Sequence, residues 1–141
     1  MLTHALIHIK PFRSAGASRT HEGPAGRSTR GARWERVGTV GRTWADHTPL
    51  AVSQGQRVEL DIVNRSRMAP PMHLHGHHFQ VVALNGQALS GAMHDTVLVP
   101  VNGRVRVAFD ADNPGRWLFH CHNLYHMATG MMTEVAYAGF A

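Results

Sequence analysis

From about residue 40 onward, apolar and polar residues alternate over short segments, which is the period of β-strands. Arg57–Asn64 has apolar residues at alternate positions, and Arg104–Asp110 repeats that pattern. The same reasoning predicts strands at His78–Leu84, Thr96–Val101, Trp117–Cys121 and Met132–Tyr137. Many short strands at regular spacing predict an all-β sandwich or barrel.

Turn-forming residues separate these segments. Asn85-Gly86 and Asn102-Gly103 are dipeptides typical of tight hairpin turns, and Asn113-Pro114-Gly115 predicts a further turn. Residues 123–129 lack a strand period, so we expect a short loop or a single helical turn there. The chain shows no internal repeat, and its 141 residues suit one domain.

The first part of the chain has a different composition. Residues 14–36 are dominated by Ser, Gly, Ala and Arg and show no apolar period of either kind. We therefore predict a disordered basic arm over residues 1–39 and a folded domain over residues 40–141. Translation from a misplaced start codon or in a shifted frame would give an arm of this kind, and so would a regulatory tail.

Charge follows the same division of the chain. Residues 1–42 contain eight Lys or Arg and two Glu, whereas the remaining 99 residues contain six Arg and seven acidic residues. The net charge of +5 thus belongs to the arm, which lacks the interleaved aromatic residues that suit single-stranded nucleic acid, so we expect no nucleic-acid partner. No apolar run reaches the ~18 residues of a membrane span and no export signal is recognisable, so the compartment stays unknown.

Histidine is the unusual residue of this chain. Seven of its twelve histidines fall in two clusters, Met72-His73-Leu74-His75-Gly76-His77-His78 and His120-Cys121-His122-Asn123-Leu124-Tyr125-His126. Alternate residues of a strand share a face, so the two His-x-His pairs can converge as four imidazoles. The single cysteine, Cys121, then points to the opposite face of its strand.

These donors suit copper. Imidazole binds copper well, and a thiolate with imidazole and a distant methionine sulfur is the ligand set of a blue electron-transfer site. Because Cys121 lies between His120 and His122, one backbone step would join the two kinds of site. Zinc is the rival metal, because four imidazoles could also hold it.

The two clusters resemble the last domain of laccase-type multicopper oxidases. That family carries His-Pro-x-His-x-His-Gly-His and later His-Cys-His-x-x-x-His-x-x-x-x-Met, which the segments 70–77 and 120–131 match. The segments 94–97 and 112–117 resemble the family's Asp-Thr-Val and Asn-Pro-Gly-x-Trp. The resemblance extends over residues 41–138 and implies a plastocyanin-like, cupredoxin-like Greek-key β-sandwich.

The resemblance also implies a role for each matching residue. Four histidines would bind a trinuclear copper centre, the first on its type 2 ion and the others on its type 3 pair: His73, His75, His120 and His122. Three residues would bind type 1 copper, the last as the weak axial ligand: Cys121, His126 and Met131. His77 matches a family histidine that is not a ligand.

Two departures from the family pattern matter. The family's other type 1 histidine falls on Pro70, whose side chain has no donor atom, so we expect an impaired type 1 site. The family's trinuclear centre also takes four histidines from another domain, so only half of that centre is expected here. The implied partners are copper ions and another cupredoxin domain or subunit, and we expect the isolated chain to be inactive.

Three functions remain open from the sequence. The chain can belong to an oxidase that takes single electrons from phenols, amines or metal ions and reduces dioxygen to water. It can instead be a non-catalytic copper-binding or electron-transfer module, or a degenerate fragment. The family usually works in the periplasm or outside the cell. A cupin is the rival fold, although it gives no reason for Met131.

The remaining histidines and the large aromatic residues have simpler interpretations. No metal is expected on six histidines: His4, His8, His21, His47, His78 and His94. Packing in the core is expected for three aromatic residues: Phe79, Trp117 and Phe119.

Overall fold

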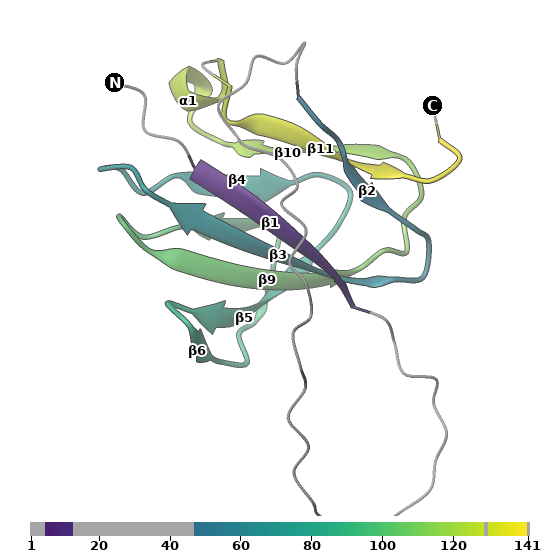
Figure 1. Cartoon of the computed structure of the whole chain (residues 1–141), viewed down its shortest axis with the longest axis horizontal. Helices are drawn as coiled ribbons and strands as arrows, with labels where there is room; N and C mark the ends of the chain where they lie inside the picture. Colours follow the sequence, from purple (N-terminus) through teal and green to yellow (C-terminus); the bar gives the residue numbers. More distant parts are fainter. Residues whose placement is uncertain (1–4, 13–46, 129, 141) are drawn as a thin grey trace, which may run out of the picture.

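The computed structural model describes residues 5–12, 47–128 and 130–140, with the backbone alone for residues 5–12. These residues form two packed β-sheets and one short helix (Figure 1). The predicted all-β sandwich is confirmed. Within the described ranges, no helix is long and apolar enough to cross a membrane.

The first sheet contains six strands. Its order is β1-β3-β9-β5-β6 with β7 also paired to β5, and all neighbouring strands are antiparallel. The bounds are β1 (Ala5–Phe12), β3 (Arg57–Asn64), β5 (Phe79–Leu84), β6 (Gln87–Ala88), β7 (Met93–His94) and β9 (Arg104–Asp110). β3 and β9 coincide with predicted strands, because each keeps an apolar face against the core along its length.

The second sheet contains five strands in the order β2-β11-β10-β4-β8. The bounds are β2 (Leu50–Val52), β4 (Pro71–Leu74), β8 (Thr96–Leu98), β10 (Arg116–Cys121) and β11 (Met132–Tyr137). The β2–β11 pair is parallel, and the other pairs are antiparallel. The helix α1 (Leu124–Ala128) follows β10, at the place where the sequence predicts a loop or a helical turn.

Apolar side chains from both sheets fill the space between them. Phe79 and Phe109 from the first sheet belong to one cluster with Leu74 and Phe119 from the second, and all four are 0% exposed. Trp117 is partly buried against this cluster, which agrees with its predicted packing role. Full burial of one such side chain stabilises the fold by roughly 1.5–3 kcal/mol, so the core holds the two sheets face to face.

The two Asn-Gly dipeptides have different roles. Asn85 and Gly86 have positive φ angles of 48° and 85° and join β5 to β6 as the predicted hairpin. Asn102 also has a positive φ, 51°, but it connects β8 in one sheet to β9 in the other. The hairpin prediction is wrong there, because β8 pairs with β4 whereas β9 pairs with β3 and β5.

One strand lies inside the segment predicted to be a disordered arm. Ala5–Phe12 forms β1 and pairs with β3 along its whole length (Figure 1). This corrects the prediction for these eight residues, whose alternation of isoleucine and polar residues is hidden by the composition of the longer arm. Residues 13–39 lie outside the described residues, so the boundary at residue 40 stays a prediction.

Candidate metal centre

The neighbouring strands β4 and β10, each with the residue that follows it, carry the two His-x-His pairs. Their register places His73 opposite His120. The residues on either side of His73 and of His120 point into the core and are 0% exposed: Met72, Leu74, Phe119 and Cys121. The expected alternation is therefore present, with imidazoles on the outer face of the sheet and the thiol on its inner face.

All four histidines expected at a trinuclear centre lie together on this outer face. The ring centroid of His73 is 4.7 Å from that of His75, 5.7 Å from that of His120 and 5.8 Å from that of His122. His75 Nε2 and His120 Nε2 are 2.9 Å apart. Two nitrogens at this separation can both reach one metal ion at the usual distance of about 2.0 Å.

In two of these rings, His73 and His120, a hydrogen bond to a backbone carbonyl decides which ring nitrogen is free to bind metal. His73 Nδ1 lies 2.9 Å from Asp95 O and 2.9 Å from Thr96 Oγ1, and His120 Nδ1 lies 2.9 Å from Cys121 O. A carbonyl oxygen only accepts, so Nδ1 carries the proton in both rings and Nε2 keeps its lone pair. Unprotonated Nε2 atoms are the donors that copper requires, so these residues fit the metal.

The four rings differ in exposure. His75 and His122 are exposed and His73 is partly exposed, but His120 is buried at 8% exposure. Four imidazoles that await a partner domain are expected to be exposed, and this expectation is wrong for His120. Its strand lies inside the sheet, where His73 flanks it on one side and Met132 on the other.

Electrostatics around the cluster favour a neutral imidazole at His75 and a charged carboxylate at Asp95. Partial desolvation, followed by the neighbouring rings of His73, His120 and His122, lowers the pKa of His75. A hydrogen bond from the Thr96 hydroxyl lowers the pKa of Asp95, whose Oδ1 lies 3.8 Å from His73 Nδ1. Lone pairs and a nearby negative charge together favour a bound cation.

The cluster does not complete a metal site by itself. Within the described ranges, no group of three or more His, Cys, Asp or Glu side chains is arranged to hold a metal ion. His75 and His120 supply two converged nitrogens, and the other two imidazoles lie nearby. Two converged nitrogens are fewer donors than a copper ion takes, so this arrangement is an incomplete set of ligands.

The predicted type 1 residues lie on the inner side of the same strand. Cys121 is 0% exposed, and its Sγ lies 3.6 Å from Nδ1 of His126 in α1. Met131 packs partly buried against the core, and its carbonyl accepts a 2.9 Å hydrogen bond from the Cys121 N–H. Desolvation raises the pKa of the Cys121 thiol.

Pro70 lies next to this inner site. It is buried immediately before β4, and its carbonyl accepts a 3.1 Å hydrogen bond from the Val99 N–H. The carbonyl of the next residue, Pro71, accepts a 2.7 Å hydrogen bond from the His122 N–H. Pro70 therefore precedes a residue that is bonded to the chain where it leaves β10. The pyrrolidine ring offers no lone pair, so a blue site with two imidazoles does not fit the residues at this position.

The other described histidine side chains are not part of this four-ring cluster. His77 is buried, with both ring nitrogens hydrogen-bonded. His47 lies 3.2 Å from Glu134, a contact between residues 87 positions apart that the sequence did not suggest. His78 and His94 are exposed, whereas His4, His21 and the side chain of His8 lie outside the described residues.

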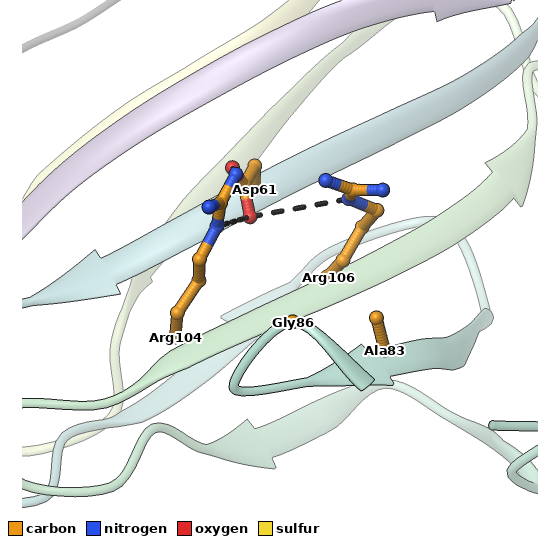
Figure 2. Close-up of a pocket in the computed structure, with 5 residues that line it drawn as sticks. All are labelled: Asp61, Ala83, Gly86, Arg104 and Arg106. Carbon is orange, nitrogen blue, oxygen red and sulfur yellow. Dashed lines mark hydrogen bonds and ion pairs between the residues drawn. The ribbon is translucent and has the colours of Figure 1, made fainter. Parts of the chain in front are cut away.

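A small cavity of about 30 Å³ lies on the first sheet, away from the histidines. Its lining residues are Asp61, Ala83, Gly86, Arg104 and Arg106. Figure 2 shows Asp61 between the two arginines, with a 2.7 Å hydrogen bond to Arg104 and Arg106 Nε 4.0 Å away. This volume suits about one water molecule, so the cavity is too small for a substrate.

Known proteins of one family match this sequence. The family model described as multicopper oxidase matches residues 20–139. The chain is 43% identical over 97 residues to multicopper oxidase MmcO of Mycobacterium tuberculosis, covering 69% of this chain and 19% of that protein. It is 39% identical over 95 residues to a copper resistance protein A homolog of Pseudomonas syringae pv. tomato, covering 67% and 16%.

Solved structures of two oxidases superpose on this chain. Blue copper oxidase from Nitrosomonas europaea superposes with a TM-score of 0.64 and 29% identity, covering 67% of this chain and 32% of that chain. McoA multicopper oxidase from Aquifex aeolicus superposes with a TM-score of 0.62 and 32% identity, covering 70% and 26%. This chain therefore spans less than a third of each of these relatives. The family match and the shared cupredoxin-like fold establish that the chain belongs to the multicopper oxidase family.

Proposed function

We propose that this chain supplies half of the trinuclear copper centre of a multicopper oxidase. His73 is assigned to its type 2 ion, and His75, His120 and His122 are assigned to its type 3 pair. One observation carries this assignment, the convergence of four imidazoles on one face of the β4–β10 pair with two Nε2 atoms 2.9 Å apart.

In the complete oxidase, bound copper would supply one-electron oxidation of phenols, amines or metal ions at the type 1 site and reduction of dioxygen to water at the trinuclear centre. This chain's residues contribute lone pairs at Nε2, and a covalent path through Cys121 joins the inner thiol to the outer imidazoles. We assign the remaining imidazoles to another cupredoxin domain or subunit. The chain's coverage of only 19% of one relative supports this, because most of that protein has no counterpart here.

We propose further that the type 1 site is incomplete. Pro70 stands where the second imidazole is needed, and three donors remain: Cys121, His126 and Met131. This soft donor set suits Cu(I) better than Cu(II) in trigonal geometry. The isolated chain is therefore expected to bind copper without oxidising phenols.

Copper titration of the full chain tests the four-histidine assignment. Electron paramagnetic resonance and a competing chromophoric chelator report the Cu(II) affinity. His75→Ala and His120→Ala should each weaken binding at least ~10-fold, because each removes one of the two converged nitrogens.

His78→Ala is the matched control for this titration. His78 is an exposed histidine three residues from His75 but outside the cluster, so its loss should leave the affinity unchanged. Equal loss in all three variants, or no loss in His75→Ala, would remove the assignment.

A second candidate function is a non-catalytic copper-binding or electron-transfer module. It is favoured by the inner thiol of Cys121, which lies 3.6 Å from His126 Nδ1 as donors of an electron-transfer site do, in a chain that spans only 19% of one oxidase. Oxygen consumption with a phenol, measured with and without a cupredoxin protein bearing two further His-x-His pairs, separates the candidates. Activity only with the added protein supports the oxidase, and tight copper binding without activity in either case supports the module.

A further inference from the structure

His77 is a buried histidine beside the cluster that takes no part in the proposed copper binding. It is 5% exposed, and its ring lies against Phe109, Trp117 and Tyr137 with centroid separations of 5.0, 6.0 and 5.8 Å. Its Nδ1 lies 3.2 Å from the carbonyl oxygen of His75, and its Nε2 lies 2.6 Å from the Tyr137 hydroxyl oxygen. Both ring nitrogens are therefore engaged.

These two partners require a single tautomer of His77. A carbonyl oxygen can only accept, so Nδ1 carries the proton and donates it to His75 O. Nε2 then has a lone pair and accepts a hydrogen bond from the Tyr137 hydroxyl. One neutral tautomer of the imidazole therefore satisfies both partners.

The turn that carries His75 is held on both sides. The His75 N–H donates a 2.9 Å hydrogen bond to Leu118 O, while its carbonyl accepts the bond from His77. Gly76 has a φ of 69°, and a Cβ added there would lie 2.3 Å from the Trp117 ring, so only glycine fits between them. The peptide groups on either side of the His75 side chain are thus fixed in place.

We propose that His77 and Tyr137 are positioning residues for His75. By fixing its carbonyl, they direct its imidazole toward His120, where the two Nε2 atoms lie 2.9 Å apart. The inference rests on the proposed function of His75 as a copper ligand. The hydrogen bond between His75 and His120, however, can be measured without metal.

Side-chain volume alone does not account for an imidazole at position 77. A phenylalanine ring would fill a similar space against Trp117 and Phe109, but it offers no N–H to the His75 carbonyl. Without that donor the carbonyl loses this partner, and the turn keeps only the His75 N–H bond to Leu118 O and the packing of Gly76 against Trp117. The hydroxyl of Tyr137 matters in turn because it holds His77 in the tautomer that donates to His75.

The test compares His77→Phe and Tyr137→Phe with the control Thr133→Val in the full chain. Thr133 lies on β11, as Tyr137 does, is 3% exposed, and donates one 3.2 Å hydrogen bond to a backbone carbonyl. We expect His77→Phe to weaken Cu(II) binding by ~10–100-fold, the range for outer partners of metal ligands. Tyr137→Phe should weaken it by ~3–10-fold, because His77 keeps its donor, and Thr133→Val should leave it unchanged.

Ring ¹⁵N spectra of the metal-free chain provide a readout that stability alone would not move. In His77→Phe, the ring ¹⁵N signals of His75 and His120 should shift toward the values of imidazoles that share no hydrogen bond. They should stay in place in Thr133→Val, even if that variant is less stable.

Unchanged copper affinity and unchanged ¹⁵N signals in both phenylalanine variants would overturn the inference. If His77→Phe does not fold, Tyr137→Phe decides the question alone, since it deletes only one oxygen atom. Failure of the proposed function looks different. In that case the unaltered chain would bind no copper at the cluster. The ¹⁵N spectra of the metal-free chain and of its variants would still test whether His77 and Tyr137 position His75.

Discussion

The two faces of β10 present the proposed copper donors in opposite ways. On the outer face, His120 joins three other imidazoles, two of which are exposed. On the inner face, Cys121 is 0% exposed, with His126 3.6 Å away and Pro70 in place of a second imidazole. Another chain can supply donors that are missing at a surface. A donor missing inside a core can be restored only by mutation.

Pro70→His should have the largest effect, because it would abolish this contrast. With Cu(II), the variant should develop an intense visible absorption from the Cys121 thiolate, since two imidazoles then complete the trigonal set. The added ligand should also raise copper affinity by ~10-fold or more, about 1.4 kcal/mol. Visible spectroscopy of the titrated protein measures the change.

Pro70→Ala is the control for this prediction, because it removes the ring without adding a donor. It should stay nearly colourless, like the unaltered chain. A strong blue colour in the unaltered chain, or none in Pro70→His, would show that Pro70 does not limit the inner site.

The next largest effect should be a difference in chemical reactivity between the faces. Cys121 in the folded chain should react with a thiol reagent at least ~100-fold more slowly than in denaturant, because it is buried and its pKa is raised. The rate should rise with pH, since the thiolate is the reactive form. Exposed His75 and His122 should be carbethoxylated without unfolding, and mass spectrometry can follow both reactions. Rapid alkylation of the folded chain would mean that the inner site is open to solvent.

Thr96→Val should have a smaller effect, confined to the outer face. The Thr96 hydroxyl lies 2.9 Å from His73 Nδ1, which also has the Asp95 carbonyl as a partner. Loss of the hydroxyl should therefore weaken Cu(II) binding only ~3–10-fold. The thiol reactivity of Cys121 should not change. A loss as large as that of His75→Ala would mean that the Asp95 carbonyl does not hold the His73 ring.

Glu134→Gln should have the smallest effect, and it should spare both metal regions. The Arg116 hydrogen bond, and then His47, lower the pKa of Glu134 below its ordinary value of 4.5. The carboxylate thus contributes stability that is present above pH 4.5 and is lost as pH falls through the lowered pKa. The variant should lose only a small part of its stability at neutral pH, because Arg116 is exposed and water already solvates much of its charge.

Urea unfolding at neutral and acidic pH measures the effect of Glu134→Gln. Stability should fall less steeply below pH 4.5 in the variant than in the unaltered chain. Equal pH dependence in both proteins would assign the acid sensitivity to other carboxylates. Unchanged copper affinity would confirm that the ion pair acts on the sheet and not on the cluster.

Much of the fold was predictable where alternation runs over six or more residues. β3 and β9 have the predicted bounds for this reason, and β11 also has its predicted bounds although its residues do not alternate. β2, β6 and β7 contain only two or three residues, too few to show any period. Burial of His120 depends on which strands flank β10, and that order is set by long-range pairing that local patterns do not encode.

The residues of the candidate site were predictable because the spacing of histidine and cysteine is itself the signal. The hydrogen-bond partners of His73 were not, because Asp95 and Thr96 come from a strand more than 20 residues away that pairs with β4. The only hint was the resemblance of residues 94–97 to a family segment. The roles of His77 and Tyr137 were equally hidden, since 60 residues separate them.

The pairing of β1 with β3 has a consequence for the order of folding. It joins Phe12 to Arg57 across roughly 45 residues, and closing such a loop costs about 3 kcal/mol of chain entropy. The other strands of both sheets lie within residues 50–137, so they can assemble before that cost is met. Until β1 arrives, the N–H and C=O groups along one side of β3 stay unpaired and can recruit a strand from another molecule. Refolding yield should therefore fall with protein concentration.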